Sequence, residues 1–189
     1  MEKKVTYFEK AGRENTGASL QIVKDAIREF GYRHLVLAST SGDCGVLFSE
    51  SLKDGGINLI VVTHSAGFRE PNSEEISAEA RQRIALAGAK VYTGTMITHS
   101  LETAFASKFS GLYPTLIVAQ ALRRFGEGAK VCCEMVMMAA DAGLVPEGEE
   151  IIAVAGTGRG ADTVLLIKSA VSKRFLDLKV LEVLAKPRG

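Results

Sequence analysis

A glycine-rich stretch near the C-terminus is the first candidate for chemistry. It consists of Gly156, Thr157, Gly158, Arg159, Gly160, Ala161 and Asp162, and it lies between two apolar runs. Closely spaced glycines let successive backbone amides turn inward around an anion, and an arginine adds a planar fork that suits phosphate. The same stretch is also compatible with a connection that only turns a tight corner. Taken alone, its residues favour neither interpretation.

The glycine spacing excludes one familiar site. A dinucleotide fingerprint needs G-x-G-x-x-G directly after a strand and at the start of a helix, because the pyrophosphate rests on the amides of that helix. Here the spacing is G-x-G-x-G, and β-branched residues typical of a strand follow. The stretch is therefore not interpreted as a nicotinamide dinucleotide site.

A second polar loop strengthens the phosphate interpretation. It contains Ser39, Thr40, Ser41, Gly42 and Asp43, directly after an apolar run and before a predicted helix. Hydroxyl groups and helix N-terminal amides at the end of a strand can bind a phosphate together. A helix cap alone would explain one hydroxyl group, but not all three.

The residues Thr63 and His64 follow the next apolar run. The histidine can act as a general acid or base, donate to a ligand oxygen, or form a hydrogen bond with a purely structural role. The tripeptide recurs as Thr98-His99-Ser100, where we expect Thr98 to cap a helix.

Five apolar runs predict the strands that position these loops. The runs are continuous, which is typical of a parallel sheet covered on both faces. About seven residues separate the last two runs, too few for a crossover helix, so we expect these two strands to be antiparallel. The tail at 176–184 alternates and predicts an added edge strand that Pro187 ends. The five runs are 34–38, 58–62, 89–93, 150–155 and 163–167.

Helical patterns separate the strands. One begins at a cap formed by Asn15 or Thr16 and ends at Gly31. Another has the capping-box spacing of Asn72 and Glu75 and ends at Gly88. Further helices are expected at about 43–54, 99–109, 114–125 and 128–142.

Composition limits the classes of partner. The 189 residues suit a single domain, 1–189, and 23 basic against 22 acidic residues give no reason to expect nucleic acid as a partner. Three cysteines, two of them adjacent, and the absence of zinc-binding motifs indicate a reducing cytoplasm and no metal site. No apolar run is long enough to cross a membrane. We therefore expect a cytoplasmic protein.

These residues together resemble a known family. The order of a strand, "STSGD", a helix and "NLIVVTH", followed much later by "ADAGLVPEGEEIIAVAGTGRGADTVLLI", is similar to the C-terminal α/β domain of pyruvate kinase. It is closer still to archaeal proteins that consist of this domain alone, and the resemblance covers about residues 15–170. It implies a three-layer α/β/α sandwich whose mostly parallel, five-stranded sheet has the order 3-2-1-4-5, with the fifth strand antiparallel and extra helices outside the sheet.

The resemblance also implies a ligand. In pyruvate kinase the two loops that match 39–43 and 156–162 bind the phosphates of a sugar bisphosphate activator, and similar stand-alone proteins are associated with flavin mononucleotide (FMN). We therefore expect a phosphorylated small molecule or flavin nucleotide, FMN foremost, with Asp162 accepting a hydrogen bond from a ribityl or ribose hydroxyl. A flavin would make redox chemistry possible. The predicted binding residues are Asn15, Thr16, Ser39, Thr40, Ser41, Gly42, Thr63, His64 and all seven residues of 156–162.

The sequence departs from pyruvate kinase in two respects. These 189 residues contain no barrel domain and none of its phosphoryl-transfer residues, so we do not expect pyruvate kinase activity. The segment 94–126 has no counterpart that we can identify.

Two alternatives to simple ligand binding stay open. The first is a small hydrolase in which Ser39 or Ser41 is the nucleophile, His64 the base and Asp162 the group that orients it; the sequence lacks the G-x-S-x-G motif. The second is a regulatory module without chemistry that forms a homo-oligomer through the apolar helix at 129–143. The three methionines of that helix, Met135, Met137 and Met138, are better explained as core packing.

Overall fold

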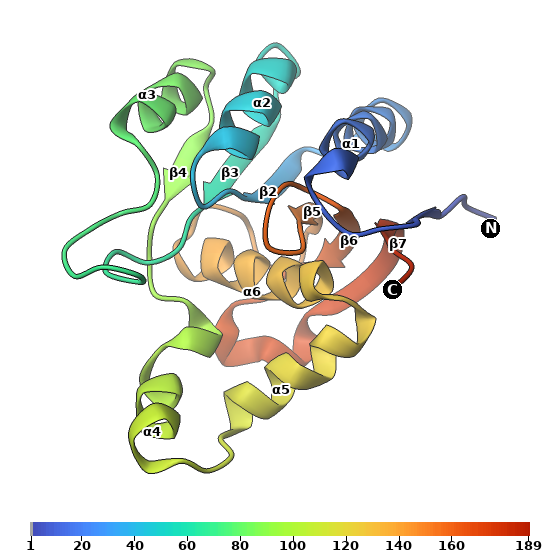
Figure 1. The fold of residues 1–189 in the computed structure, drawn as a ribbon. Helices are drawn as coiled ribbons and strands as arrows, with labels where there is room; N and C mark the ends of the chain where they lie inside the picture. The colour runs from blue at the N-terminus through green and yellow to red at the C-terminus, as the bar shows by residue number, and fades with distance from the viewer. Residues whose placement is uncertain (1) are drawn as a thin grey trace.

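A single seven-stranded sheet organises the chain (Figure 1). The computed structural model describes residues 2–189, and the strands lie in the order β1-β7-β6-β5-β2-β3-β4. The strands are β1 (Thr6–Phe8), β2 (His34–Ala38), β3 (Asn58–Val62), β4 (Lys90–Tyr92), β5 (Glu150–Ala155), β6 (Thr163–Lys168) and β7 (Lys179–Pro187).

The predicted five-stranded order is confirmed within this sheet. The strands β4, β3, β2, β5 and β6 are neighbours in that sequence; β2 runs parallel to both β3 and β5, whereas β5 and β6 are antiparallel. The glycine loop therefore joins two antiparallel neighbours, as its length predicts. The carboxyl ends of β2, β3, β4 and β5 lie at the same edge of the sheet.

The tail forms a strand, but it is not the edge strand we expected. The strand β7 pairs with β6 on one side and with β1 on the other, and Pro187 is its last residue, opposite Phe8. The true edge is β1, a three-residue strand that is too short to produce a recognisable pattern in the sequence.

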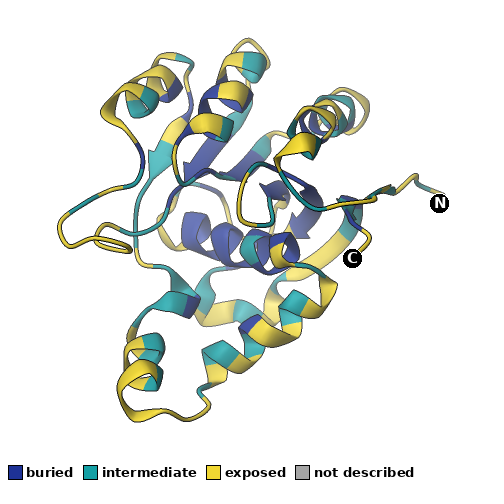
Figure 2. Cartoon of the chain, viewed as in Figure 1, coloured by how far each residue is buried: buried dark blue, intermediate teal, exposed yellow. Residues whose placement is uncertain are grey.

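Two hydrophobic cores explain the continuous apolarity of the strands. Successive side chains of a strand point to opposite faces of the sheet. Leu35 and Leu37 pack on the side of the first three helices, whereas Val36 packs on the side of the sixth. Figure 2 shows the buried strands between exposed helix surfaces. The helices are α1 (Thr16–Phe30), α2 (Asp43–Leu52), α3 (Ala78–Leu86), α4 (Leu101–Phe109), α5 (Pro114–Leu122) and α6 (Glu127–Asp141).

Two predicted helix starts are wrong. Neither Asn15 nor Thr16 caps α1 through its side chain, because both side chains form hydrogen bonds with the preceding turn instead. The helix predicted from the spacing of Asn72 and Glu75 begins only at Ala78, where the hydroxyl of Ser77 accepts a hydrogen bond from the amide of Ala80. Asn72 lies in a loop with a φ of 60°.

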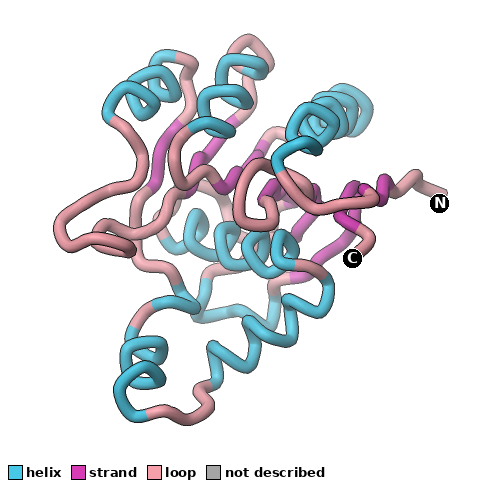
Figure 3. Tube along the Cα trace, viewed as in Figure 1, coloured by secondary structure: helices cyan, strands magenta, loops and turns pink. Residues whose placement is uncertain are grey.

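The helix α6 is the main core element on its side of the sheet and not an oligomerisation surface. Met135, Met137 and Met138 are at most 5% exposed, which confirms their role in packing and leaves no apolar face of the helix for another chain. The largest exposed apolar side chains of this half lie instead on and around α4 and α5 (Figure 3), among them Phe109, Leu112 and Phe125. Among residues 2–189, no helix combines the length and the apolar character needed to span a bilayer.

Candidate functional site

The glycine loop owes its shape to the carboxylate of Asp162. This side chain is fully buried, and its Oδ2 accepts hydrogen bonds from the amides of Gly12 and Thr157, both at 3.0 Å, while its Oδ1 accepts one from the Thr163 hydroxyl at 2.9 Å. Gly156 must be a glycine because a Cβ there would lie 2.2 Å from the carbonyl oxygen of Gly160. Asp162 is thus a structural residue of the loop, which differs from the ligand-binding role that the sequence suggested.

The chain before α1 packs directly on this loop. The amide of Ala161 donates to the Thr16 hydroxyl at 3.0 Å, and Gly160, with a φ of +77°, lies so close that a Cβ would be 2.3 Å from the Cα of Arg13. The side-chain amide of Asn15 donates to two carbonyl oxygens of the same segment. Asn15 and Thr16 therefore hold the loop and the 12–16 segment together.

The second loop begins α2 at the same edge of the sheet. Ser39 is buried and its hydroxyl accepts a hydrogen bond from the amide of Gly45 at 2.9 Å, which makes it the side-chain cap of α2. The hydroxyl of Ser41 donates to Asp43. Because Leu37 lies opposite Val154 in the parallel pair β2 and β5, the two loops leave the sheet side by side. Figure 1 shows the glycine loop beneath the beginnings of α1 and α2.

Two arginines near the loops lack an acidic partner. Arg13 and Arg159 are exposed, and neither forms an ion pair within residues 2–189. Arg13 also lies near the start of α2: burial and the charge of Asp43 raise the pKa of the Cys44 thiol, and the Arg13 charge partly opposes them. The sequence analysis missed Arg13, because only the folded chain places it beside a loop that lies almost 150 residues away.

His64 belongs to a chain of polar side chains, although not the one proposed for a hydrolase. Its Nδ1 contacts Glu75 Oε2 at 2.6 Å, and its Nε2 lies 3.3 Å from the hydroxyl of Thr40. Arg69 binds the other oxygen of Glu75 at 2.9 Å. The hydrolase built from Ser39 or Ser41, His64 and Asp162 is therefore wrong, because His64 contacts none of these partners. The arrangement that exists can polarise the Thr40 hydroxyl or donate a proton to an anion beside it.

Thr63, the other residue predicted after β3, serves the backbone. It is buried, and its hydroxyl contacts the Thr93 hydroxyl at 2.7 Å and the carbonyl oxygen of His64 at 2.8 Å. Thr63 thus joins the loop after β3 to the end of β4.

A second polar cluster contains His99, which the sequence analysis set aside. Thr98 does not cap a helix: it lies within a short 3₁₀ turn, and both its amide and its hydroxyl donate to Glu134 Oε1 at 2.7 Å. Lys130 and Glu134 form an ion pair that is almost fully buried. The available signals were the repeated "THS" and a Lys and Glu four residues apart on an apolar helix.

Phe68 connects the two histidines. Its ring centroid lies 4.3 Å from that of His64 and 5.8 Å from that of His99. The residues Thr40, His64, Phe68 and His99 consequently form a continuous surface along the carboxyl ends of the strands, from the start of α2 to the segment after β4.

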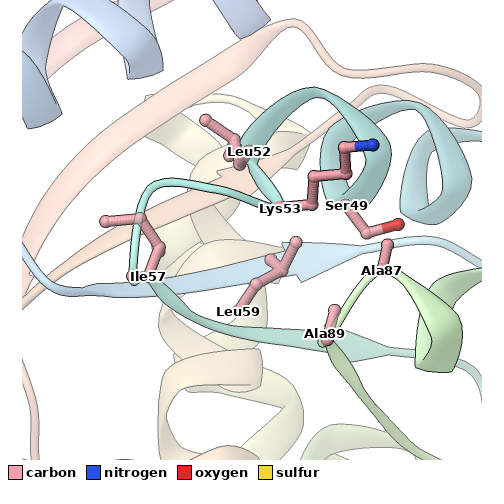
Figure 4. Close-up of a pocket in the computed structure, with 9 residues that line it drawn as sticks. Ser49, Leu52, Lys53, Ile57, Leu59, Ala87 and Ala89 are labelled. Atoms are coloured by element: carbon pink, nitrogen blue, oxygen red, sulfur yellow. The ribbon is translucent and has the colours of Figure 1, made fainter.

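The hollow drawn in Figure 4 lies elsewhere. It has a volume of ≈ 200 Å³ between the C-terminal half of α2 and the starts of β3 and β4, at the opposite edge of the sheet from the loops. Apart from Ser49 and Lys53, its side chains are aliphatic. Within residues 2–189, no group of three or more His, Cys, Asp or Glu side chains gathers to hold a metal ion.

The fold and these loops define an α/β domain with polar loops where its parallel strands end. Residues 18–167 match the family described as pyruvate kinase, alpha/beta domain. The match covers most of the 189 residues, so the chain belongs to this family.

One solved structure was compared with the chain. The crystal structure of O-ureido-L-serine synthase aligns with a TM-score of 0.32 and 19% identity, covering 61% of this chain and 31% of that one. The present chain thus spans about a third of that protein, and a similarity of this size does not inform its function.

Proposed function

We propose that the protein binds the phosphate group of a small phosphorylated ligand, FMN foremost, between the loop at 39–43 and the glycine loop. The observation that carries this proposal is the position of Arg13 and Arg159. Two exposed guanidinium groups without carboxylate partners flank a loop of closely spaced glycines, beside the first turn of α2. Such groups bind phosphate through charge-assisted, often bidentate hydrogen bonds.

The backbone supports an anion at the same place. The first amides of a helix lack intrahelical partners, and the aligned peptide dipoles favour negative charge there. In α2 the Ser39 hydroxyl satisfies only the amide of Gly45. The amides of Thr40, Gly42 and Asp43 have no hydrogen-bond partner among residues 2–189 and are available to phosphate oxygens.

The neighbouring surface suits a planar ring. Phe68 is 40% exposed beside His64 and His99, and aromatic side chains stack on flat heterocycles. A ligand with its phosphate at the two loops and its ring at Phe68 would extend along the ends of β2 and β3. If FMN is the ligand, it supplies hydride or electron transfer, and the residues described here supply binding and orientation.

Calorimetric titration of the purified protein with FMN, riboflavin and inorganic phosphate tests this proposal. FMN should bind much more tightly than riboflavin, which lacks the phosphate, and inorganic phosphate should compete with FMN. Arg13→Ala and Arg159→Ala should each weaken FMN binding about tenfold or more, because each removes a charge-assisted contact.

Arg28→Ala is the matched control, because Arg28 is an exposed arginine at the far end of α1 that pairs only with Asp25. It changes the net charge equally and should leave FMN affinity unchanged. Equal affinities for FMN and riboflavin, or equal losses in all three arginine variants, would contradict the proposed site.

A further inference from the structure

A buried hydrogen-bond chain ends at the imidazole of His99. Lys130 donates to Glu134 Oε2, the Thr98 hydroxyl donates to Glu134 Oε1 at 2.7 Å, and the same hydroxyl lies 3.1 Å from His99 Nδ1. Lys130, Glu134 and Thr98 are each at most 6% exposed, whereas His99 is only partly buried. The chain thus runs from the core towards the surface.

The direction of each hydrogen bond fixes the tautomer of His99. Burial alone would raise the pKa of Glu134, but the Lys130 charge and the hydrogen bonds from Lys130 and Thr98 outweigh it and keep this carboxyl ionised. An ionised carboxylate only accepts, so the single hydroxyl proton of Thr98 is committed to Glu134. Thr98 must therefore accept a proton from Nδ1 of His99, and the neutral ring carries its lone pair on Nε2.

The surroundings keep the ring neutral. Burial lowers the pKa of His99 most, the Lys130, Arg123 and His64 charges lower it further, and Glu134 opposes them. These groups come from α6, from the turn after α5 and from the loop after β3, the elements packed around the ring. Within residues 2–189, no group forms a hydrogen bond with Nε2.

We propose that His99 Nε2 accepts a hydrogen bond from the ring N–H or hydroxyl group of the bound ligand, with Thr98 and Glu134 as its positioning residues. The location supports this role, because His99 contacts the edge of Phe68, the aromatic residue nearest the Thr40 end of the site. The inference rests on the proposed function, and it adds a selection: the site favours phosphorylated ligands that carry a donor group at the end opposite the phosphate.

The experiment compares FMN with inorganic phosphate in four proteins: wild type, His99→Leu, His99→Gln and Thr98→Val. His99→Leu removes the acceptor and should weaken FMN binding about tenfold while leaving phosphate affinity unchanged. His99→Gln places an amide oxygen near the position of Nε2 and should restore part of the FMN affinity. FMN methylated at its ring imide nitrogen should bind wild type about tenfold more weakly, and His99→Leu should not discriminate against it.

Imidazole ¹⁵N chemical shifts of the ligand-free protein test the positioning residues. Wild-type His99 should show a protonated Nδ1 and an unprotonated Nε2 at neutral pH, and Thr98→Val should shift it towards the other tautomer. A purely structural role for Thr98 would not move this signature.

The outcomes separate the two proposals. Wild-type protein that binds neither FMN nor phosphate would overturn the proposed function and this inference with it. Wild-type protein that binds both, together with His99→Leu that retains full FMN affinity, would overturn this inference alone.

Discussion

The carboxylate of Asp162 accepts a hydrogen bond from the amide of Gly12, at 3.0 Å and across 150 positions of sequence. This contact ties the glycine loop to the segment before α1. Asp162→Ala would leave the amides of Gly12 and Thr157 without partners, and we expect it to lower the free energy of unfolding by about 3 kcal/mol. Asp162→Asn keeps one oxygen for both amides and should cost about 1 kcal/mol. Urea unfolding followed by circular dichroism measures both.

Asp25→Ala is the control for this pair of variants. Asp25 lies on the exposed face of α1 and pairs with Arg28, so its removal should change stability by less than about 0.5 kcal/mol. If Asp162→Ala behaved like this control, the carboxylate would not hold the loop.

The contact between Gly160 and Arg13 predicts a strong effect of a single methyl group. At Gly160 an added Cβ meets backbone at 2.3 Å and the φ of +77° disfavours any side chain, so Gly160→Ala should destabilise the protein by at least about 2 kcal/mol. Gly17→Ala offers the matched comparison. Nothing lies within 4 Å of its added Cβ, and Gly17 is in helix α1, so the protein should become about 0.5 kcal/mol more stable. Thermal unfolding of both variants gives the sign of each change.

The cysteines should differ in their reaction with iodoacetamide at pH 8. Cys132 and Cys133 are at most 1% exposed, and burial raises the pKa of Cys133 to about 11, so neither should react before unfolding. Cys44 is partly exposed with a moderately raised pKa, so it should react slowly. Added phosphate or FMN should slow it further, because the proposed anion site adjoins Cys44. Peptide mass spectrometry measures each rate, and alkylation of the adjacent pair in folded protein would contradict the core packing.

The buried pair of Lys130 and Glu134 predicts a non-additive response. Lys130→Met leaves an uncompensated carboxylate in the core and should cost about 3–5 kcal/mol. Adding Glu134→Leu removes that charge and should restore much of the loss. A double variant whose loss equals the sum of the two single losses would show that the pair is not coupled.

The lowered pKa of Glu134 predicts how stability depends on pH. A carboxyl whose folded pKa lies below its unfolded value contributes stability that is present above the unfolded value and is lost as pH falls through the folded one. His99 has the same sign, because its lowered pKa makes protonation below about pH 6.5 favour unfolding. Stability measured by urea unfolding should therefore fall from pH 7 to pH 3, and it should fall less steeply between pH 5 and 3 in Glu134→Gln.

The sequence predicted most of the fold because its signals are local. Continuous apolar runs identify strands buried on both faces, and a seven-residue connection cannot cross over a sheet, so the antiparallel pairing of β5 and β6 followed from length alone. The capping positions were less accessible. Both Asn15 and Asn72 have the right residue type for a cap, but hydrogen bonds with neighbouring turns compete for their side chains or move the helix start.

The sequence by itself determined the strand order's central part, the loops that face one edge of the sheet and the residue types available to bind an anion there. Only the tertiary structure decided what each side chain does: Asp162 is used inside the loop, His64 pairs with Glu75, and Arg13 and His99 join the candidate site. The physical reason is that hydrogen-bond partners and charge neighbours depend on distances between segments far apart in the chain. Residue type and spacing carry no record of those distances.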